Sequence, residues 1–158
     1  MNSHYQSHIT KIGRKIARLA QMLDNPKLFS LRWRGISIDT FLKLNQPWLT
    51  EAGINTIFDI GANVGQFAKL IHEVLPTAMI YSFEPLKDCF GELKKRMQKV
   101  DNFEAFNVAL SDTNGELEFH RNEYSPSSSV LSMADLHKQN YPFTAKEYLT
   151  KVRSARVR

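Results

Sequence analysis

The sequence is poor in cysteine. Cys89 is the single cysteine among 158 residues, so no internal disulfide can form. One thiol without the paired cysteine and histidine spacing of a metal site also gives no zinc centre, and we expect no bound metal. A chain without disulfides fits a reducing compartment.

Long hydrophobic runs are absent as well. No stretch approaches the roughly 18 to 20 consecutive apolar residues that a membrane-spanning helix needs, so we expect no membrane span. The first residues, Met1-Asn2-Ser3-His4, lead into a basic segment rather than into the apolar region of a secretion signal. The sequence therefore predicts a cytoplasmic location.

The composition that remains is typical of a globular domain. Hydrophobic residues make up 42% of the chain and charged residues 23%, which excludes disordered and low-complexity classes. A chain of 158 residues is long enough for one domain that buries about two-thirds of its unfolded surface. It leaves no room for a second domain of full size.

The positive charge is concentrated at the two ends. The net charge is +5, from 21 Lys and Arg against 16 Asp and Glu. Residues 1–35 carry +6, residues 36–150 carry −5 and residues 151–158 carry +4. A nucleic-acid surface needs a basic stripe interleaved with aromatic residues, which the acidic middle lacks. We therefore expect no nucleic-acid partner.

Residues 1–50 are predicted to form an N-terminal helical arm. Apolar residues recur there at helical spacing: Ile9, Ile12, Ile16, Leu19, Ala20 and Leu23. Basic residues line another face: Lys11, Arg14, Lys15 and Arg18. The apolar stripe lacks the Trp or Phe that favours a membrane interface. We therefore favour a helix docked on its own domain, and peripheral contact with anionic lipid is the alternative.

The middle of the chain alternates between strand and helix patterns. The expected strands are residues 56–60, 78–83 and 103–110, and the expected helices follow Gly65 and Pro85. Such alternation predicts an α/β fold with a parallel sheet. A turn at 111–115 and a half-exposed strand with Leu117 and Phe119 inward come next, followed by a Ser-rich loop at 124–129.

Polar and glycine residues follow the first two expected strands. Asp59, Gly61, Asn63 and Gly65 surround the first turn, and Glu84 ends the second strand. In an open α/β sheet these strand ends meet at one crevice, where ligands bind. A carboxylate at the Glu84 position can accept hydrogen bonds from both hydroxyls of an adenosine ribose. The pattern therefore predicts a nucleoside cofactor.

The first turn favours one nucleoside cofactor over another. A dinucleotide fingerprint has the pattern G-x-G-x-x-G, whereas this turn has Asn63 in its middle and an acid, Asp59, before its first glycine. That acid would repel a pyrophosphate and suits the ammonium and sulfonium groups of S-adenosyl-L-methionine. The alternative without a cofactor is that Asp59 and Gly61 only shape a tight turn and Glu84 only caps a helix.

Three linked segments resemble the FkbM-type methyltransferases. They are Ile57 to Phe67, Tyr81 to Pro85, and Asn107 to Asp112 with Gly115 to Phe119, and the likeness covers about residues 50–131. It implies a Rossmann-like class I methyltransferase fold that uses S-adenosyl-L-methionine to methylate a hydroxyl of a sugar or other small molecule. It also implies cofactor-binding residues: Asp59, Gly61, Ala62, Asn63 and Gly65 around the methionine part, Glu84 on the ribose, and Asn107 to Ala109 near the adenine.

The resemblance further implies a seven-stranded sheet, of which this sequence supplies a part. We expect residues 51–158 to be the N-terminal half of a methyltransferase domain, a partial parallel sheet of three βα units plus a hairpin-like strand. Residues 151–158 would approach a fourth strand. Strand 56–60 would then be an unpaired edge, open to self-association. A catalytic base is not identified.

Two alternatives remain open for the function. One is a catalytically inactive fragment that binds a nucleoside cofactor or a partner chain, and the weaker one is a dinucleotide enzyme. Other candidate residues favour ordinary roles: His72 and His120 as solvated side chains, Cys89 as a small core or surface residue rather than a nucleophile, and Ser127 to Ser129 as a plain loop rather than an acceptor pocket.

Overall fold

The computed structural model describes residue 13 and residues 25–156, and the chain divides into two compact units, residues 1–46 and 47–158. The predicted amphipathic helix of residues 9–23 falls outside the described residues, apart from Gly13. Among the described residues, no helix is both long and apolar enough to cross a membrane.

The described part of the first unit holds two short helices, α2 (Pro26–Trp33) and α3 (Ile38–Leu44). The Asn25 side chain accepts a hydrogen bond from the Lys27 amide at 3.1 Å and caps α2. Ser37 caps α3 in the same way, through the amide of Thr40. Both caps satisfy amides that have no partner inside their helix.

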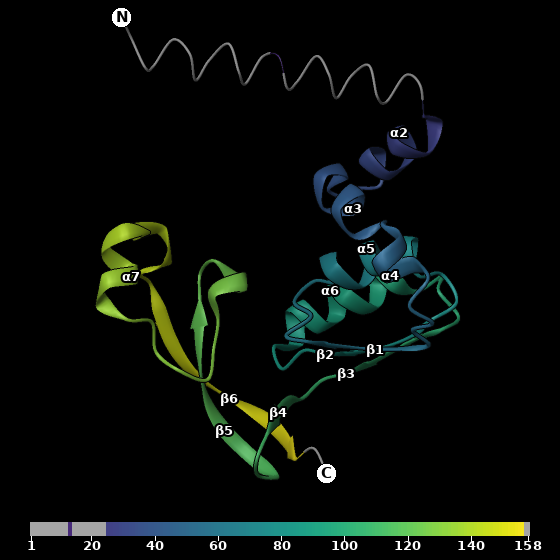
Figure 1. Ribbon diagram of the computed structural model, residues 1–158. Helices are drawn as coiled ribbons and strands as arrows, with labels where there is room; N and C mark the ends of the chain where they lie inside the picture. Colours follow the sequence, from purple (N-terminus) through teal and green to yellow (C-terminus); the bar gives the residue numbers. More distant parts are fainter. Residues whose placement is uncertain (1–12, 14–24, 157–158) are drawn as a thin grey trace, which may run out of the picture. The chain divides into compact units, whose positions relative to one another are not determined.

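The second unit contains most of the predicted α/β pattern (Figure 1). Its elements in chain order are α4 (Pro47–Thr50), β1 (Thr56–Ile60), α5 (Gln66–Val74), β2 (Met79–Phe83), α6 (Lys87–Met97), β3 (Phe103–Phe106), β4 (Ala109–Ser111), β5 (Gly115–Asn122), η1 (Ser125–Ser127), α7 (Asp135–Asn140), η2 (Pro142–Thr144) and β6 (Glu147–Arg156).

The first sheet is parallel, with strand order β1-β2-β3, and Ile60 pairs with Phe83 at its carboxyl end. Helices α5 and α6 cover one of its faces (Figure 1). Ile80, Leu93 and Met97 are almost completely buried between the sheet and these helices. The predicted α/β fold with a Rossmann-like parallel sheet is therefore confirmed.

The other face of this sheet carries a row of aromatic rings. The Phe58 and Tyr81 ring centres lie 5.6 Å apart, and those of Phe83 and Phe106 lie 5.1 Å apart. Phe58 is 63% exposed and Ile60 is 65% exposed. In the described sheet β1 is an edge strand, as predicted, whereas self-association through that edge stays a prediction.

The third strand differs from the prediction. Residues 103–110 form two short strands, β3 and β4, that belong to different sheets. Asn107 interrupts them: its side chain donates to the carbonyl oxygens of Glu84 and Pro85, both at 2.9 Å. The chain turns there, and the amide of Val108 closes the turn on the carbonyl of Phe106. Helix α6 also begins two residues later than Pro85, at Lys87.

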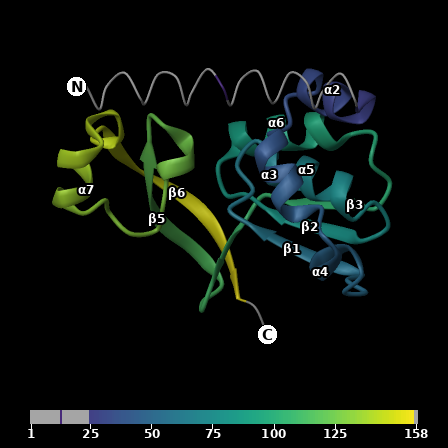
Figure 2. The ribbon, with the colours of Figure 1, turned by 45° about the horizontal axis from the view of Figure 1, so that its top comes forward.

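The second sheet has the order β4-β6-β5. The expected hairpin-like strand β5 pairs antiparallel with β6 rather than with β4, and the two run side by side as a long ribbon (Figure 2). Strand β6 therefore occupies the segment where an approach to a fourth strand was expected. A small core joins this sheet to the start of α6: Leu86, Cys89, Ala109, Phe119 and Val152. Arg121 on β5 also forms a bidentate ion pair with Asp88 on α6.

Gly65 allows α5 and α6 to approach closely. Its φ is +81°, and a Cβ built on it would lie 2.7 Å from a methyl group of Leu93. Leu93 is fully buried, so its methyl cannot move aside without disturbing the core. Gly53 has a similar φ of +67° but has open space around its Cβ position.

We expect Gly65→Ala to lower the free energy of unfolding by about 2 to 4 kcal/mol, because overpacking adds to left-handed strain. The matched control Gly53→Ala carries the strain alone and should cost about 1 kcal/mol. Urea denaturation of the two variants and the parent measures the difference. Equal losses of unfolding free energy in the two variants would show that close packing against Leu93 adds nothing to the cost of the substitution.

Candidate active site

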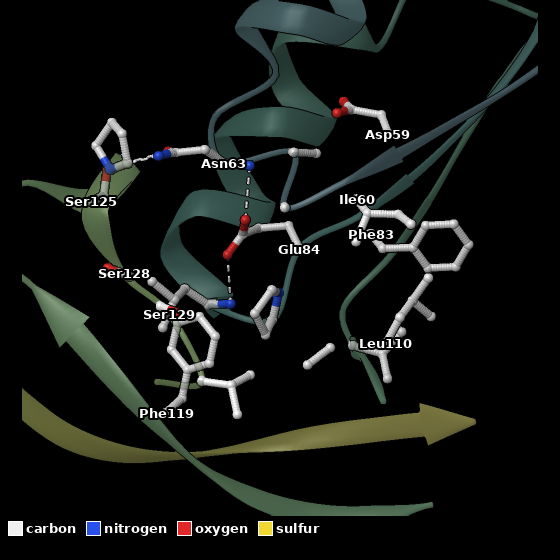
Figure 3. A pocket seen from close by; sticks show the side chains of 18 of the residues that line it. Asp59, Ile60, Asn63, Phe83, Glu84, Leu110, Phe119, Ser125, Ser128 and Ser129 are labelled. Carbon is white, nitrogen blue, oxygen red and sulfur yellow. Dashed lines mark hydrogen bonds between the residues drawn. The ribbon is translucent and has the colours of Figure 1, made fainter. Parts of the chain in front are cut away.

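A pocket of about 620 Å³ opens at the carboxyl ends of the parallel strands (Figure 3). It is lined by residues from the ends of β1 and β2, from the start of β4 and from the loop that follows β5. Its size falls within the range of small-molecule sites. Two of its lining residues are carboxylates, Asp59 and Glu84, and no lysine or arginine is among the described residues that line it.

Glu84 is held at the centre of this wall and is 5% exposed. Its Oε2 accepts the backbone amide of Asn63 and its Oε1 accepts that of Leu86, both at 2.8 Å (Figure 3). Burial raises the pKa of Glu84, and the two amide bonds oppose that rise without cancelling it. The carboxylate thus fixes the turn after β1 and the turn after β2, and each oxygen keeps a further lone pair.

Asp59 lies one strand away and is 7% exposed. It pairs in register with Ser82, whose hydroxyl donates to its Oδ2 at 3.2 Å. Burial raises the pKa of Asp59, against the smaller opposite effect of that hydrogen bond. Charged carboxylates are costly to bury without a cationic partner, so this site favours a ligand that brings positive charge.

The turn between β1 and α5 is unusual in its backbone. Gly61 and Gly65 have φ of +77° and +81°, and Asn63 has φ of +50°, the one non-glycine residue with positive φ in the described chain. The amides of Gly61 and Ala62 donate to the carbonyl of Phe83, at 2.9 and 3.1 Å. These two amides therefore tie the turn to β2.

A serine loop, residues 124–129, forms the opposite wall of the pocket. Asn63 Nδ2 donates to Ser125 Oγ at 3.1 Å, and the hydroxyl lies 3.2 Å from Asn63 Oδ1 (Figure 3). Ser125, Ser128 and Ser129 line the pocket. The loop was expected to be a plain connection, but the structure brings part of it to the pocket.

Most of the predicted site residues line this one pocket: Asp59, Gly61, Ala62, Asn63, Glu84 and Ala109. Gly65 and Asn107 are not among the residues that line it. Gly65 instead packs against α6. Asn107 holds the turn after β2 and lines a second, more polar hollow of about 800 Å³.

Several pocket residues were missed by sequence reasoning. Phe119 had a signal, because its alternation on the strand placed it inward. Phe67 also had a signal, because it lies two residues after Gly65 at the end of the first predicted turn. Ser125 had none, because a serine in a loop is common in any domain. It becomes a pocket residue only through the packing of elements distant in the sequence.

The remaining candidate residues are not among those that line the pocket. Cys89 is buried and burial raises the pKa of its thiol, which opposes a nucleophilic role, as predicted. His120 is half-buried rather than solvated, with Nδ1 3.8 Å from Glu147. His72 is half-buried rather than solvated, and its buried Nδ1 has no partner in the described part of the chain. No cluster of the described residues has the three or more ligands of a metal site.

Comparison with known proteins adds an independent line of evidence. Part of the chain is 36% identical, over 72 residues, to the 2-O-methyltransferase NoeI of Sinorhizobium fredii (strain NBRC 101917 / NGR234). That match covers 46% of this chain and 30% of NoeI, so the chain spans less than a third of that relative. A chain of a solved fibrillarin/Nop5p complex is similar at a TM-score of 0.35 and 10% identity, over 66% of this chain and 74% of that one. At that level the likeness adds nothing to the assignment.

A family model described as the methyltransferase FkbM domain matches residues 59–157. The matched segment begins at the pocket carboxylate Asp59 and includes β2, β3 and both edges of the second sheet. It covers more than half of the chain. The chain therefore belongs to the FkbM methyltransferase family.

Proposed function

We propose that this domain binds S-adenosyl-L-methionine in the pocket after β1 and β2, and that the protein transfers its methyl group to a hydroxyl of a small molecule. One observation carries the proposal: the pocket holds two buried carboxylates and no lysine or arginine among its described lining residues. S-adenosyl-L-methionine brings a sulfonium and an ammonium group. Family membership and the name of the relative NoeI support methyl transfer to oxygen.

The two carboxylates fit two parts of that cofactor. Glu84 ends β2, where a ribose lies in Rossmann-like sites, and its free lone pairs can accept both ribose hydroxyls. Asp59 ends β1 beside the tight turn and supplies negative charge for the methionine ammonium. The apolar side chains of Leu86, Val108 and Ala109 line the same pocket and suit an adenine ring. The resemblance placed Asn107 near the adenine, and we now assign it a structural role.

The chemistry asked of these residues is mainly positioning. Methyl transfer is an in-line displacement in which the sulfonium charge disperses, so much of the rate comes from holding the acceptor oxygen roughly 3 to 3.5 Å from the methyl carbon. The serine loop faces the pocket across from the β1 turn and is the described segment suited to the acceptor side. We assign no catalytic base.

Two other functions remain to be separated by experiment. A dinucleotide enzyme would also place a carboxylate on a ribose, but its pyrophosphate would meet two carboxylates and, among the described lining residues, no lysine or arginine. A catalytically silent fragment would bind a nucleoside cofactor, or a partner chain, without methyl transfer. Titration calorimetry with S-adenosylhomocysteine and with NAD distinguishes a methyltransferase from a dinucleotide enzyme. Binding of NAD alone would overturn the proposal that S-adenosyl-L-methionine is the cofactor.

We expect Glu84→Gln to lower the affinity for S-adenosylhomocysteine about tenfold or more, because charge-assisted bonds to the ribose are worth about 1.5 to 3 kcal/mol each. It should also destabilise the fold by about 1 to 3 kcal/mol, since an amide NH₂ would face one of the two backbone amides. Calorimetry well below both melting temperatures separates the two effects.

The matched control is Glu104→Gln on β3, an exposed carboxylate away from the pocket. It should change stability by less than about 0.5 kcal/mol and leave the affinity unchanged. If folded Glu84→Gln binds S-adenosylhomocysteine as tightly as the parent does, Glu84 is not part of the site.

We expect Asp59→Asn to stabilise the fold and weaken cofactor binding together. At neutral pH the variant lacks a desolvated charge and keeps an acceptor for Ser82, so its melting temperature should rise by roughly 2 to 5 °C. The folded pKa of Asp59 is raised, so folding takes up a proton there and the parent gains stability as pH falls toward that pKa. The advantage of the variant should therefore shrink on acidification.

Thermal melts of both proteins between neutral and acidic pH test the expected stability difference. Calorimetry at neutral pH tests the expected loss of cofactor affinity. Because the pKa values of Glu84 and Asp59 are both raised, the parent should also start to lose cofactor affinity at a higher pH than ordinary carboxyl groups would dictate. A variant less stable than the parent at neutral pH would contradict the assigned cost of burying Asp59.

A further inference from the structure

Asn63 occupies a backbone conformation that glycine adopts without strain. Its φ is +50°, between two glycines of similar conformation. Asn is one of the few side chains tolerated there, and the chain has an amide at this position where a third glycine would fit the backbone. That choice points to a role for the side chain.

The contacts of Asn63 connect two parts of the pocket. Its backbone amide donates to Glu84 at 2.8 Å, while its side chain exchanges hydrogen bonds with Ser125. One residue therefore touches both the carboxylate that we propose binds the ribose and the loop on the opposite wall. The side chain itself points to the loop rather than into the pocket (Figure 3).

The base of the serine loop is held separately, by Asn122. This residue is 2% exposed. Its Nδ2 donates to the carbonyl of Thr144 at 2.6 Å, and its Oδ1 accepts the amide of Tyr124 at 2.9 Å. The Ser128 hydroxyl also accepts the amide of Asn122 at 2.9 Å. The loop is thus anchored to β5 at its base and reaches the β1 turn through Ser125.

We infer that Asn63 is a positioning residue, whose side chain holds the serine loop (residues 124–129) against the cofactor turn so that the two walls of the pocket close together. The inference rests on the proposed function for its ligand, S-adenosylhomocysteine. It goes beyond the resemblance, which places Asn63 around the methionine part of the cofactor. In our assignment the Asn63 side chain acts through Ser125, and its backbone amide acts through Glu84.

The chain contains its own reporter for this contact. Cys89 is its single cysteine and is 4% exposed, and burial raises the pKa of its thiol against a smaller, opposite effect of the Ser125 side chain. Cys89 also packs in the core with Leu86 and Phe119, so we expect lifting of the loop to raise its labelling rate with N-ethylmaleimide by removing Ser125, not to expose the thiol fully. Labelling rates measured at several low urea concentrations separate local opening, which depends little on urea, from global unfolding, which depends steeply on it.

The informative variants are Asn63→Gly and Ser125→Ala. Glycine keeps the amide that binds Glu84 and relieves the φ strain, so it removes the loop contact alone. Each variant should raise the urea-independent labelling rate roughly tenfold, and the double variant should add little more, because both break one contact. Ser125→Thr retains the hydroxyl and should label within about twofold of the parent.

A matched control is Asn102→Ala. Asn102 is also an asparagine whose amide binds backbone, the carbonyls of Pro76 and Ala78, but it precedes β3 at the other end of the strands. Its loss should raise labelling only through the urea-dependent, global route. If Asn63→Gly behaves as Asn102→Ala does, the side chain contributes general stability and the inference is wrong.

Cofactor coupling completes the test. Saturating S-adenosylhomocysteine should slow labelling of the parent roughly fivefold or more and slow that of Asn63→Gly by less than about twofold. Equal protection of both would overturn the coupling through Asn63. If calorimetry shows no binding to the parent, the proposed function fails, whereas the ligand-free comparison still decides whether Asn63 holds the loop.

Discussion

The Glu84 carboxylate is the contact on which the pocket depends. Its two oxygens accept one amide from the turn after β1 and one from the turn after β2, so this side chain, together with the amides of Gly61 and Ala62 on the Phe83 carbonyl, sets the distance between the two turns. Hydrogen bonds to a charged acceptor are the strong class in proteins, and here both are made with little exposure to water. A change at Glu84 is therefore a change in the shape of the site as well as in its charge.

The second constraint comes from backbone conformations that few residues tolerate. The turn from Gly61 to Gly65 places three residues at positive φ within five positions, which brings the chain from the end of β1 directly into α5. Gly65 then lies so close to Leu93 that even a methyl group would not fit. The turn is therefore held on two sides. Glu84 binds its first part to the end of β2, and the close packing of Gly65 against Leu93 holds its second part to α6.

Much of this arrangement could be predicted from the sequence, because it depends on local signals. The alternation of short apolar runs with helical stripes, the glycines after β1 and the acid after β2 are all readable within the chain. The end of β3 could not be read in this way. Residues 103–110 look like one strand, and only a contact 23 residues away, from Asn107 to the Glu84 carbonyl, divides them. The position of the serine loop at the pocket could not be predicted for the same reason, since Asn63 and Ser125 are 62 residues apart in the sequence.

The charges of the molecule separate structural carboxylates from those of the pocket. Asp88 and Glu147 each face a basic side chain, Arg121 and Lys138, and the pKa of each is lowered, as expected where an ion pair favours the charged form. Asp59 and Glu84 have hydrogen-bond donors, but no cation lines their pocket among the described residues, and burial raises their pKa values. From this pair the fold gains the two amide bonds of Glu84 but no ion pair, whereas a cationic ligand gains from both charges. The cost that they impose on the empty protein is therefore itself an argument that the pocket is built for a ligand with positive charge.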